Sequence, residues 1–176
     1  MDRRRFLAGG TAALAGALVL PMLGGCTTKA ALESWINVIG TQAALIVAKL
    51  GNVALSGQIT QATDTVVSAI AAWSAGGAAS VAIQALNLLA SLVAEVPVIS
   101  IYEPLITVIV GFLDAVLAQI PSGTISAPAV AQARTSLRSV RTPVPVSNYR
   151  DFAHKFNAAL LAAKITDIKP VKVPLF

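Results

Sequence analysis

Residues 101–120 read IYEPLITVIVGFLDAVLAQI, and this stretch decides the fold. Its polar positions recur at three- and four-residue steps along one line, and every other side is apolar. Such spacing is the period of an α-helix. A helix with one side in water usually carries a broader polar face. The narrow stripe therefore predicts a helix over 101–120 that is covered around most of its circumference. The stripe consists of Glu103, Thr107, Gly111 and Asp114.

Three earlier segments repeat this pattern. Apolar residues at helical spacing predict one helix over 29–50, which Gly51 ends, and a second over 58–74, with Ser56 as a candidate N-cap. A third helix is predicted over 78–95. Its polar residues also form one narrow stripe, so we expect it to be nearly central in the fold or to pack against a second copy or a membrane. The stripe consists of Ser80, Gln84, Asn87, Ser91 and Glu95.

Two further helices are expected in the last third of the chain. A short one begins near Ser126 and carries three arginines on one side, Arg134, Arg138 and Arg141. Another begins near Asn148 and is predicted to run to 164. Its buried face is expected to consist of Tyr149, Phe152, Phe156 and Leu160. The residues that follow alternate prolines and lysines, which predicts an extended tail with little sheet pairing.

The first 26 residues carry two short motifs in a fixed order. Arg3-Arg4-Arg5-Phe6-Leu7 precedes a short apolar stretch rich in glycine and alanine, which is the outline of an export signal. The residues Arg3, Arg4, Phe6 and Leu7 resemble the twin-arginine (Tat) motif, although Asp2 and Ala8 depart from its usual flanks. The stretch ends at Leu23-Gly24-Gly25-Cys26, which resembles a bacterial lipobox.

The resemblance implies a twin-arginine lipoprotein signal peptide, and it covers residues 1–26 only. The signal would be cut before Cys26, whose thiol would carry a diacylglycerol and whose amine could carry a further acyl chain such as palmitate. The protein would then lie in the cell envelope, outside the cytoplasm, held to a membrane through Cys26. Thr27 is not aspartate, which by the same resemblance favours the periplasmic face of the outer membrane in a host with two membranes.

Together these features predict an all-α protein, an antiparallel helical bundle of four to six helices with an extended C-terminal tail. The expected domains are a signal peptide at 1–25 and a lipid-anchored helical domain at 26–176. Within that domain we expect a four-helix core at 26–120, a loose linker with a short basic helix at 121–147, a last helix at 148–164 and the tail at 165–176.

Composition and charge indicate which kinds of molecule this chain is expected to bind. Hydrophobic residues make up 56% of the 176 residues and charged residues 12%, with a mean hydropathy of +0.75, which is more apolar than a typical soluble domain. Residues 26–125 carry two basic and five acidic residues, a net charge of −3, whereas residues 126–176 carry eight basic and two acidic ones, a net charge of +6. Such asymmetry indicates an interaction surface.

An exported protein has little access to nucleic acid, so the partners expected for the basic C-terminal third are anionic lipid or an acidic protein. Arg134, Arg138 and Arg141 are the candidate contacts with a membrane or partner. The alternative is that they form a solvated face of a short surface helix. A homo-oligomer is also compatible with the apolar composition.

Residues that could carry chemistry are few. His154 is the only histidine, and it is expected on the polar side of the last helix. Ser74 lies in a sequence that faintly resembles a Gly-x-Ser-x-Gly elbow, but a helix is expected where that elbow needs a strand. Glu103 and Asp114 share a helix face and could titrate unusually, or could mark the wet edge of the helix. With one histidine and one cysteine, no metal or cofactor is expected.

Three functions remain open at this point. The first is a non-catalytic structural or interaction protein of the cell envelope, anchored by lipid. The second is a module that binds a lipid or another apolar ligand. The third is a partly membrane-embedded helical protein, for which 98–120 is the best candidate span, although two carboxylates within it oppose insertion. Enzymatic activity is not expected.

Overall fold

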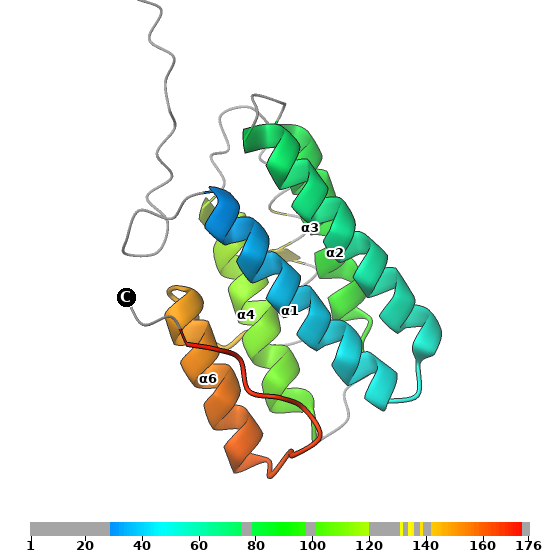
Figure 1. Ribbon diagram of the computed structural model, residues 1–176, viewed down its shortest axis with the longest axis vertical. Helices are drawn as coiled ribbons and strands as arrows, with labels where there is room; N and C mark the ends of the chain where they lie inside the picture. Colours follow the sequence, from blue (N-terminus) through cyan, green and yellow to red (C-terminus); the bar gives the residue numbers. More distant parts are fainter. Residues whose placement is uncertain are drawn as a thin grey trace, which may run out of the picture.

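A computed structural model describes residues 29–74, 79–97, 101–119, 131, 134, 135, 138 and 142–173. Within these residues the chain is all-helical and contains no strand, which confirms the predicted fold class. The helices form a compact bundle in which α1 packs on α2, α2 on α3, α3 on α4 and α4 on α6 (Figure 1). Their bounds are α1 Lys29–Lys49, α2 Val53–Ser74, α3 Ala79–Ala94, α4 Glu103–Gln119 and α6 Tyr149–Ala162.

The turn between α1 and α2 confirms the predicted glycine stop. Gly51 has a φ of 82°, a left-handed conformation that glycine adopts without a steric penalty. Asn52 N–H donates to the Val47 carbonyl at 3.2 Å and Gly51 N–H to the Ala48 carbonyl at 3.0 Å, the pair of bonds that closes a Schellman motif. The last carbonyls of α1 are thereby satisfied and the chain reverses within three residues.

The start of α2 corrects the sequence prediction. The helix begins at Val53 rather than 58, because Asn52 is its N-cap and accepts a hydrogen bond from Leu55 N–H at 3.0 Å. Ser56, the expected cap, lies one turn inside the helix. Its hydroxyl donates to the Ala44 carbonyl of α1 at 2.8 Å, so it links the two helices instead.

The close approach of α1 and α2 depends on Gly40. A Cβ at this position would lie 2.0 Å from Thr63 Oγ1, so the two helices meet where Gly40 has no side chain. Thr63 is buried, and its hydroxyl is satisfied by donating to the Ile59 carbonyl at 2.7 Å. A polar group can therefore lie in this interface without leaving an unpaired donor.

The prediction of a covered helix is confirmed for α4. From Leu105 to Leu117 every residue except Thr107 and Ala115 is buried. Pro104 lies in the first turn, where its missing N–H breaks no helical hydrogen bond. The α3 helix is not central within one chain, since its Val81 and Leu88 are 54% and 51% exposed, and its packing against a second copy or a membrane stays a prediction. Apolar residues flank the polar stripe of α3 on its exposed side. The helical period of a sequence does not show whether such apolar residues are buried or exposed.

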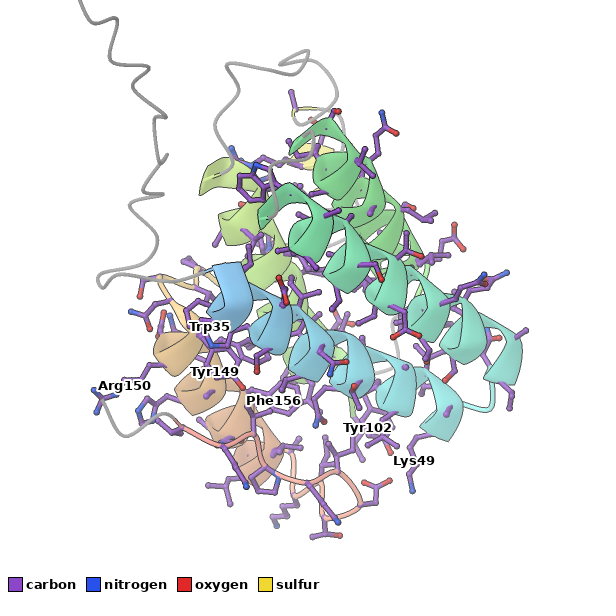
Figure 2. The ribbon with its side chains drawn as sticks, turned by 45° about the horizontal axis from the view of Figure 1, so that its top comes forward. Trp35, Lys49, Tyr102, Tyr149, Arg150 and Phe156 are labelled. Atoms are coloured by element: carbon purple, nitrogen blue, oxygen red, sulfur yellow. The ribbon has the colours of Figure 1, made fainter. Side chains whose placement is uncertain are left out.

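The last helix begins and packs as expected. Asn148 is the N-cap of α6, and its side chain accepts a hydrogen bond from Asp151 N–H at 2.8 Å. The predicted face is buried, together with Ala153. This face meets α1 and α4 through aromatic rings. Trp35 of α1 stacks on Tyr149 with ring centroids 5.1 Å apart (Figure 2). The ring of Phe112 on α4 lies 5.3 Å from that of Phe152. The α6 helix therefore belongs to the same hydrophobic core as the first four helices.

Residues after α6 return to its surface. The helix ends at Ala162, two residues before the predicted end, and Lys164 takes the left-handed conformation with a φ of 54°. Asn157 holds the following segment through two hydrogen bonds of 2.8 Å, from its Nδ2 to the Val171 carbonyl and from Val171 N–H to its Oδ1. The extended form expected for the whole 165–176 tail stays a prediction.

Among the described helices, one is long and apolar enough to cross a membrane, Ala31–Lys49, with a mean hydropathy of 1.3. It is also a core helix, since 44% of this window is buried inside the bundle. The expected span at 98–120 is a different segment. There α4 has 17 residues, and its sides are buried by its neighbours rather than open to lipid.

Candidate functional site

Three hydrogen bonds from two arginines surround Asp114 on α4. Arg134 donates to both carboxylate oxygens, from Nε to Oδ1 at 2.8 Å and from Nη2 to Oδ2 at 3.3 Å. Arg138 donates from Nη2 to Oδ2 at 2.8 Å. The Asp114 side chain is only 12% exposed, whereas those of Arg134 and Arg138 are 32% and 52% exposed. We call these three residues the Asp114 cluster.

A second contact lies one to two turns earlier on α4, at Thr107 and Gly111, where the segment 142–147 crosses the helix. Val144 N–H donates to the Thr107 carbonyl at 3.2 Å, a backbone bond between a helix and a segment without helix or strand. A Cβ on Gly111 would lie 1.8 Å from the Val144 carbonyl oxygen. Only glycine permits this crossing, because any side chain would occupy the space of the carbonyl.

These contacts correct the interpretation of the polar stripe on α4 as a wet edge. Gly111 and Asp114 are both buried, because the segment 142–147 and the two arginines cover them. Glu103 and Thr107 are partly exposed. Gly111 and Asp114 thus form the part of α4 on which the last third of the chain packs. That part of the chain supplies the two arginines that the buried Asp114 carboxylate needs as partners.

The structure describes two of the three arginines of the predicted basic row. Arg134 and Arg138 both pair with Asp114 inside the protein. Arg141 lies outside the described residues. Contact of this row with a membrane or partner stays a prediction, and for Arg134 and Arg138 it would compete with an existing ion pair.

Two opposing effects act on the Asp114 carboxyl. Burial favours its neutral form and by itself raises the pKa. The hydrogen bonds and positive charges of Arg134 and Arg138 outweigh burial together, and the pKa of Asp114 is lowered below its ordinary value of 3.8. The group is therefore ionised at neutral pH and holds its charge against acid. A general acid needs the opposite shift, so this geometry favours a structural role for Asp114 over acid–base work.

Asp114→Asn should reduce stability at neutral pH and have little effect in acid. A carboxyl with a lowered folded-state pKa stabilises the fold above its unfolded value, and that contribution is lost as the pH falls through the folded-state pKa. At pH 7 we expect a loss of about 1–2 kcal/mol, since the arginines are partly exposed. Urea unfolding of wild type and variant at pH 7, 4 and 3 measures the difference. A difference that does not shrink below pH 4 would contradict this role.

A shallow hollow of about 350 Å³ opens beside the Asp114 cluster. Its walls come from α4, from Arg138 and from the segment 142–147, and its lining residues include Gly111, Ala115, Pro143 and Val146. Lys155 donates to the Pro145 carbonyl and also bonds Asp151 Oδ2 at 2.8 Å, which fixes the segment against α6. The hollow is bordered by charged groups that are already paired.

The other residues considered for chemistry lie apart from this cluster. His154 is exposed on α6. Ser74 is the last residue of α2, so the chain before it is a helix and not the strand that a nucleophile elbow requires. Within the described residues no group of three or more His, Cys, Asp or Glu lies close enough to hold a metal ion.

A separate ion pair joins three elements at the far end of the bundle. Asp167 lies 3.4 Å from Lys49 Nζ at the end of α1, and it accepts a hydrogen bond from Tyr102 at 3.1 Å, just before α4 (Figure 2). The Lys49 and Asp167 side chains are exposed, so their ion pair adds little stability, but the contact marks where the chain after α6 meets the bundle. Spacing alone gave no signal for this contact, because its members are far apart in sequence.

The candidate signal residues, Arg3, Arg4, Phe6, Leu7 and Cys26, all lie outside the described residues. Their roles rest on the sequence motifs alone. No protein-family model matches the chain, and neither a curated protein nor a solved structure matches it.

Proposed function

We propose that this chain is an exported, lipid-anchored helical protein of a bacterial cell envelope, and that it acts without catalysis as a structural or interaction protein. Two motifs in the correct order support export and anchoring, the twin-arginine-like Arg3-Arg4-Arg5-Phe6-Leu7 and the lipobox-like Leu23-Gly24-Gly25-Cys26. The lipid on Cys26 would hold the domain on the non-cytoplasmic side of a membrane.

One observation carries the non-catalytic part of the proposal. The most buried carboxylate of the described chain, Asp114, is neutralised by two arginines and serves to hold the last third of the chain on α4. Asp151 is likewise held by Lys155, in an ion pair of 2.8 Å. These two carboxylates are thus engaged in structural contacts, Asp114 between α4 and the last third of the chain and Asp151 within α6, an arrangement typical of a scaffold.

The fold also gives a reason for export by the twin-arginine route, which carries proteins that are already folded. Every described residue of α4 from 105 to 117 is apolar, small or paired, and most of them are covered only when the neighbouring helices and the segment 142–147 are in place. Unfolded, this run is the centre of the apolar stretch 98–120, whose length reaches the roughly 20 residues that a membrane span requires. Folding before export would keep it away from the bilayer.

The lipid on Cys26 is tested by labelling cells that express the full-length protein with a radioactive fatty acid. Wild type should incorporate label, and its processed mass should equal residues 26–176 plus a diacylglycerol, with or without a further acyl chain. Cys26→Ala should lose all label and keep its signal peptide, because the peptidase needs the modified cysteine. Equal labelling of both proteins would refute the anchor.

A further inference from the structure

A groove opens on the side of the bundle formed by α2 and α3, with a volume of about 450 Å³. Three apolar residues form its floor, and polar side chains from both helices form its rim. We call it the α2–α3 groove. Its floor consists of Ala62, Leu88 and Leu92, and its rim includes Gln58, Gln61 and Glu95.

The apolar floor continues along the surface of α3. Leu88 is 51% exposed and Val81, two turns earlier on the same line, is 54% exposed. Leu92 and Glu95 follow on that line toward the C-terminal end of the helix. An exposed apolar line with a polar rim is the arrangement of a protein–protein contact.

The surface around this groove is acidic. Between Lys49 and Arg134 the sequence contains no lysine or arginine, while Asp64 and Glu95 are exposed on α2 and just after α3. A partner that brings positive charge next to an apolar side chain would therefore complement the groove.

The outward side of α6 has that composition. Arg150, His154 and Leu161 lie on one line of the helix and are exposed, and Leu161 is the most exposed large apolar residue of the described chain at 80%. Arg150 projects away from the bundle (Figure 2). Lys164 follows Leu161 by three residues and is exposed. We call these four residues the α6 outer face.

The two surfaces match in charge and in the order of their residues. Leu161 and Lys164 are three residues apart, as are Leu92 and Glu95, and in both pairs the charged residue lies just beyond the end of its helix. With Leu161 on the floor of the groove near Leu92, a lysine close behind it in the chain would face the Glu95 carboxylate. The surfaces cannot meet within one chain, because α6 and α2 lie on opposite sides of α1 and α4 (Figure 1).

We propose that copies of this chain associate head to tail, with the α6 outer face of one copy in the α2–α3 groove of the next. This contact uses two different surfaces, so a pair of copies leaves one groove and one α6 outer face free, and the association continues into chains or rings rather than stopping at a dimer. The contact is small and partly ionic, which makes it weak and sensitive to salt.

Cross-linking of the full-length protein in the producing cell tests this contact, because the chain has a single native cysteine. Gln61→Cys at the groove and Ala158→Cys on α6 are both exposed positions, and a chain carrying both receives a short bis-maleimide. We expect a ladder of dimers, trimers and longer products that contain only this chain. Val53→Cys with Ala158→Cys is the matched control, since Val53 is 74% exposed but lies away from the groove. Each single-cysteine variant controls for adducts through Cys26.

Charge exchange makes the test specific. Glu95→Lys should reduce the ladder by about fivefold, the effect of replacing one surface attraction by repulsion, and Lys164→Glu in the same chain should restore it. The proposal is overturned if the Val53→Cys control gives a ladder of equal strength, or if the charge exchange fails to restore the ladder. It is also overturned if Gln61→Cys gives adducts with a different protein, or if no ladder forms at all. This test is independent of the lipid on Cys26. A protein that fails the fatty-acid labelling test can still form the cross-linked ladder.

Discussion

Gly111→Ala is expected to destabilise the protein by about 3 kcal/mol, the upper end of the cost of overpacking a core. The added Cβ would lie 1.8 Å from the carbonyl oxygen of Val144, and β-carbons essentially never come within 3.0 Å of other atoms. The oxygen belongs to the backbone, so it cannot rotate away as a side chain would. The segment 142–147 must leave α4, and the bond from Val144 N–H to the Thr107 carbonyl is lost with it.

Gly57→Ala is the matched control for this prediction. Gly57 also lies inside a helix, but a Cβ there meets nothing within 4 Å. Because alanine favours a helix over glycine, this variant should gain up to about 1 kcal/mol. Urea unfolding of the three proteins gives both values. If Gly111→Ala were as stable as wild type, the crossing of α4 by the segment 142–147 would be wrong.

Phe152→Ala should cost about 3–5 kcal/mol, the usual range for removing a buried phenylalanine. Phe152 is fully buried on α6 and lies between two other aromatic rings, with centroids 5.3 Å from Phe112 and 5.5 Å from Phe156. The substitution leaves a cavity at the junction of α4 and α6. It tests whether the last helix shares one core with the first four.

Leu161→Ala on the same helix is the control, since that side chain is 80% exposed and should cost less than about 0.5 kcal/mol. Thermal unfolding should give one transition for Phe152→Ala at a clearly lower midpoint. Two separate transitions, with that of α1 to α4 unchanged, would mean that α6 folds independently of the bundle.

The helices themselves could be predicted from the sequence because their period and their stop signals are local. Gly51 ends α1, Asn148 and Asp151 begin α6, and four aromatic or aliphatic residues at three- and four-residue steps mark its buried face. The error at the start of α2 has the same local origin. Asn52 and Ser56 are both good caps, and only the turn geometry after Gly51 decides between them.

The Asp114 cluster could not be predicted in the same way. One interpretation of the polar stripe on α4 was a wet edge, whereas Asp114 in that stripe is covered by two arginines 20 and 24 positions later in the chain. Complementary charge was the signal in the sequence that pointed to this contact. A carboxylate in an apolar helix, such as Asp114, needs a positively charged partner, and Arg134 and Arg138 are spaced four residues apart on a predicted short helix. For α3 the sequence left open whether its apolar sides are covered within the chain or by a second copy or membrane, since hydrophobicity does not reveal which neighbours exist.

The anchor and the fold together lead to one central claim, that a lipid on Cys26 holds a folded domain whose own helices stay out of the bilayer. Fractionation of cells that express Cys26→Ala behind a cleavable signal without a lipobox tests this claim most directly. We expect wild type to stay with the membranes through high-salt and alkaline washes, and the variant to be released as a folded, protease-resistant helical protein. A variant that resists both washes as firmly as wild type would show that a helix such as Ala31–Lys49 holds the protein in the membrane, and would contradict the claim.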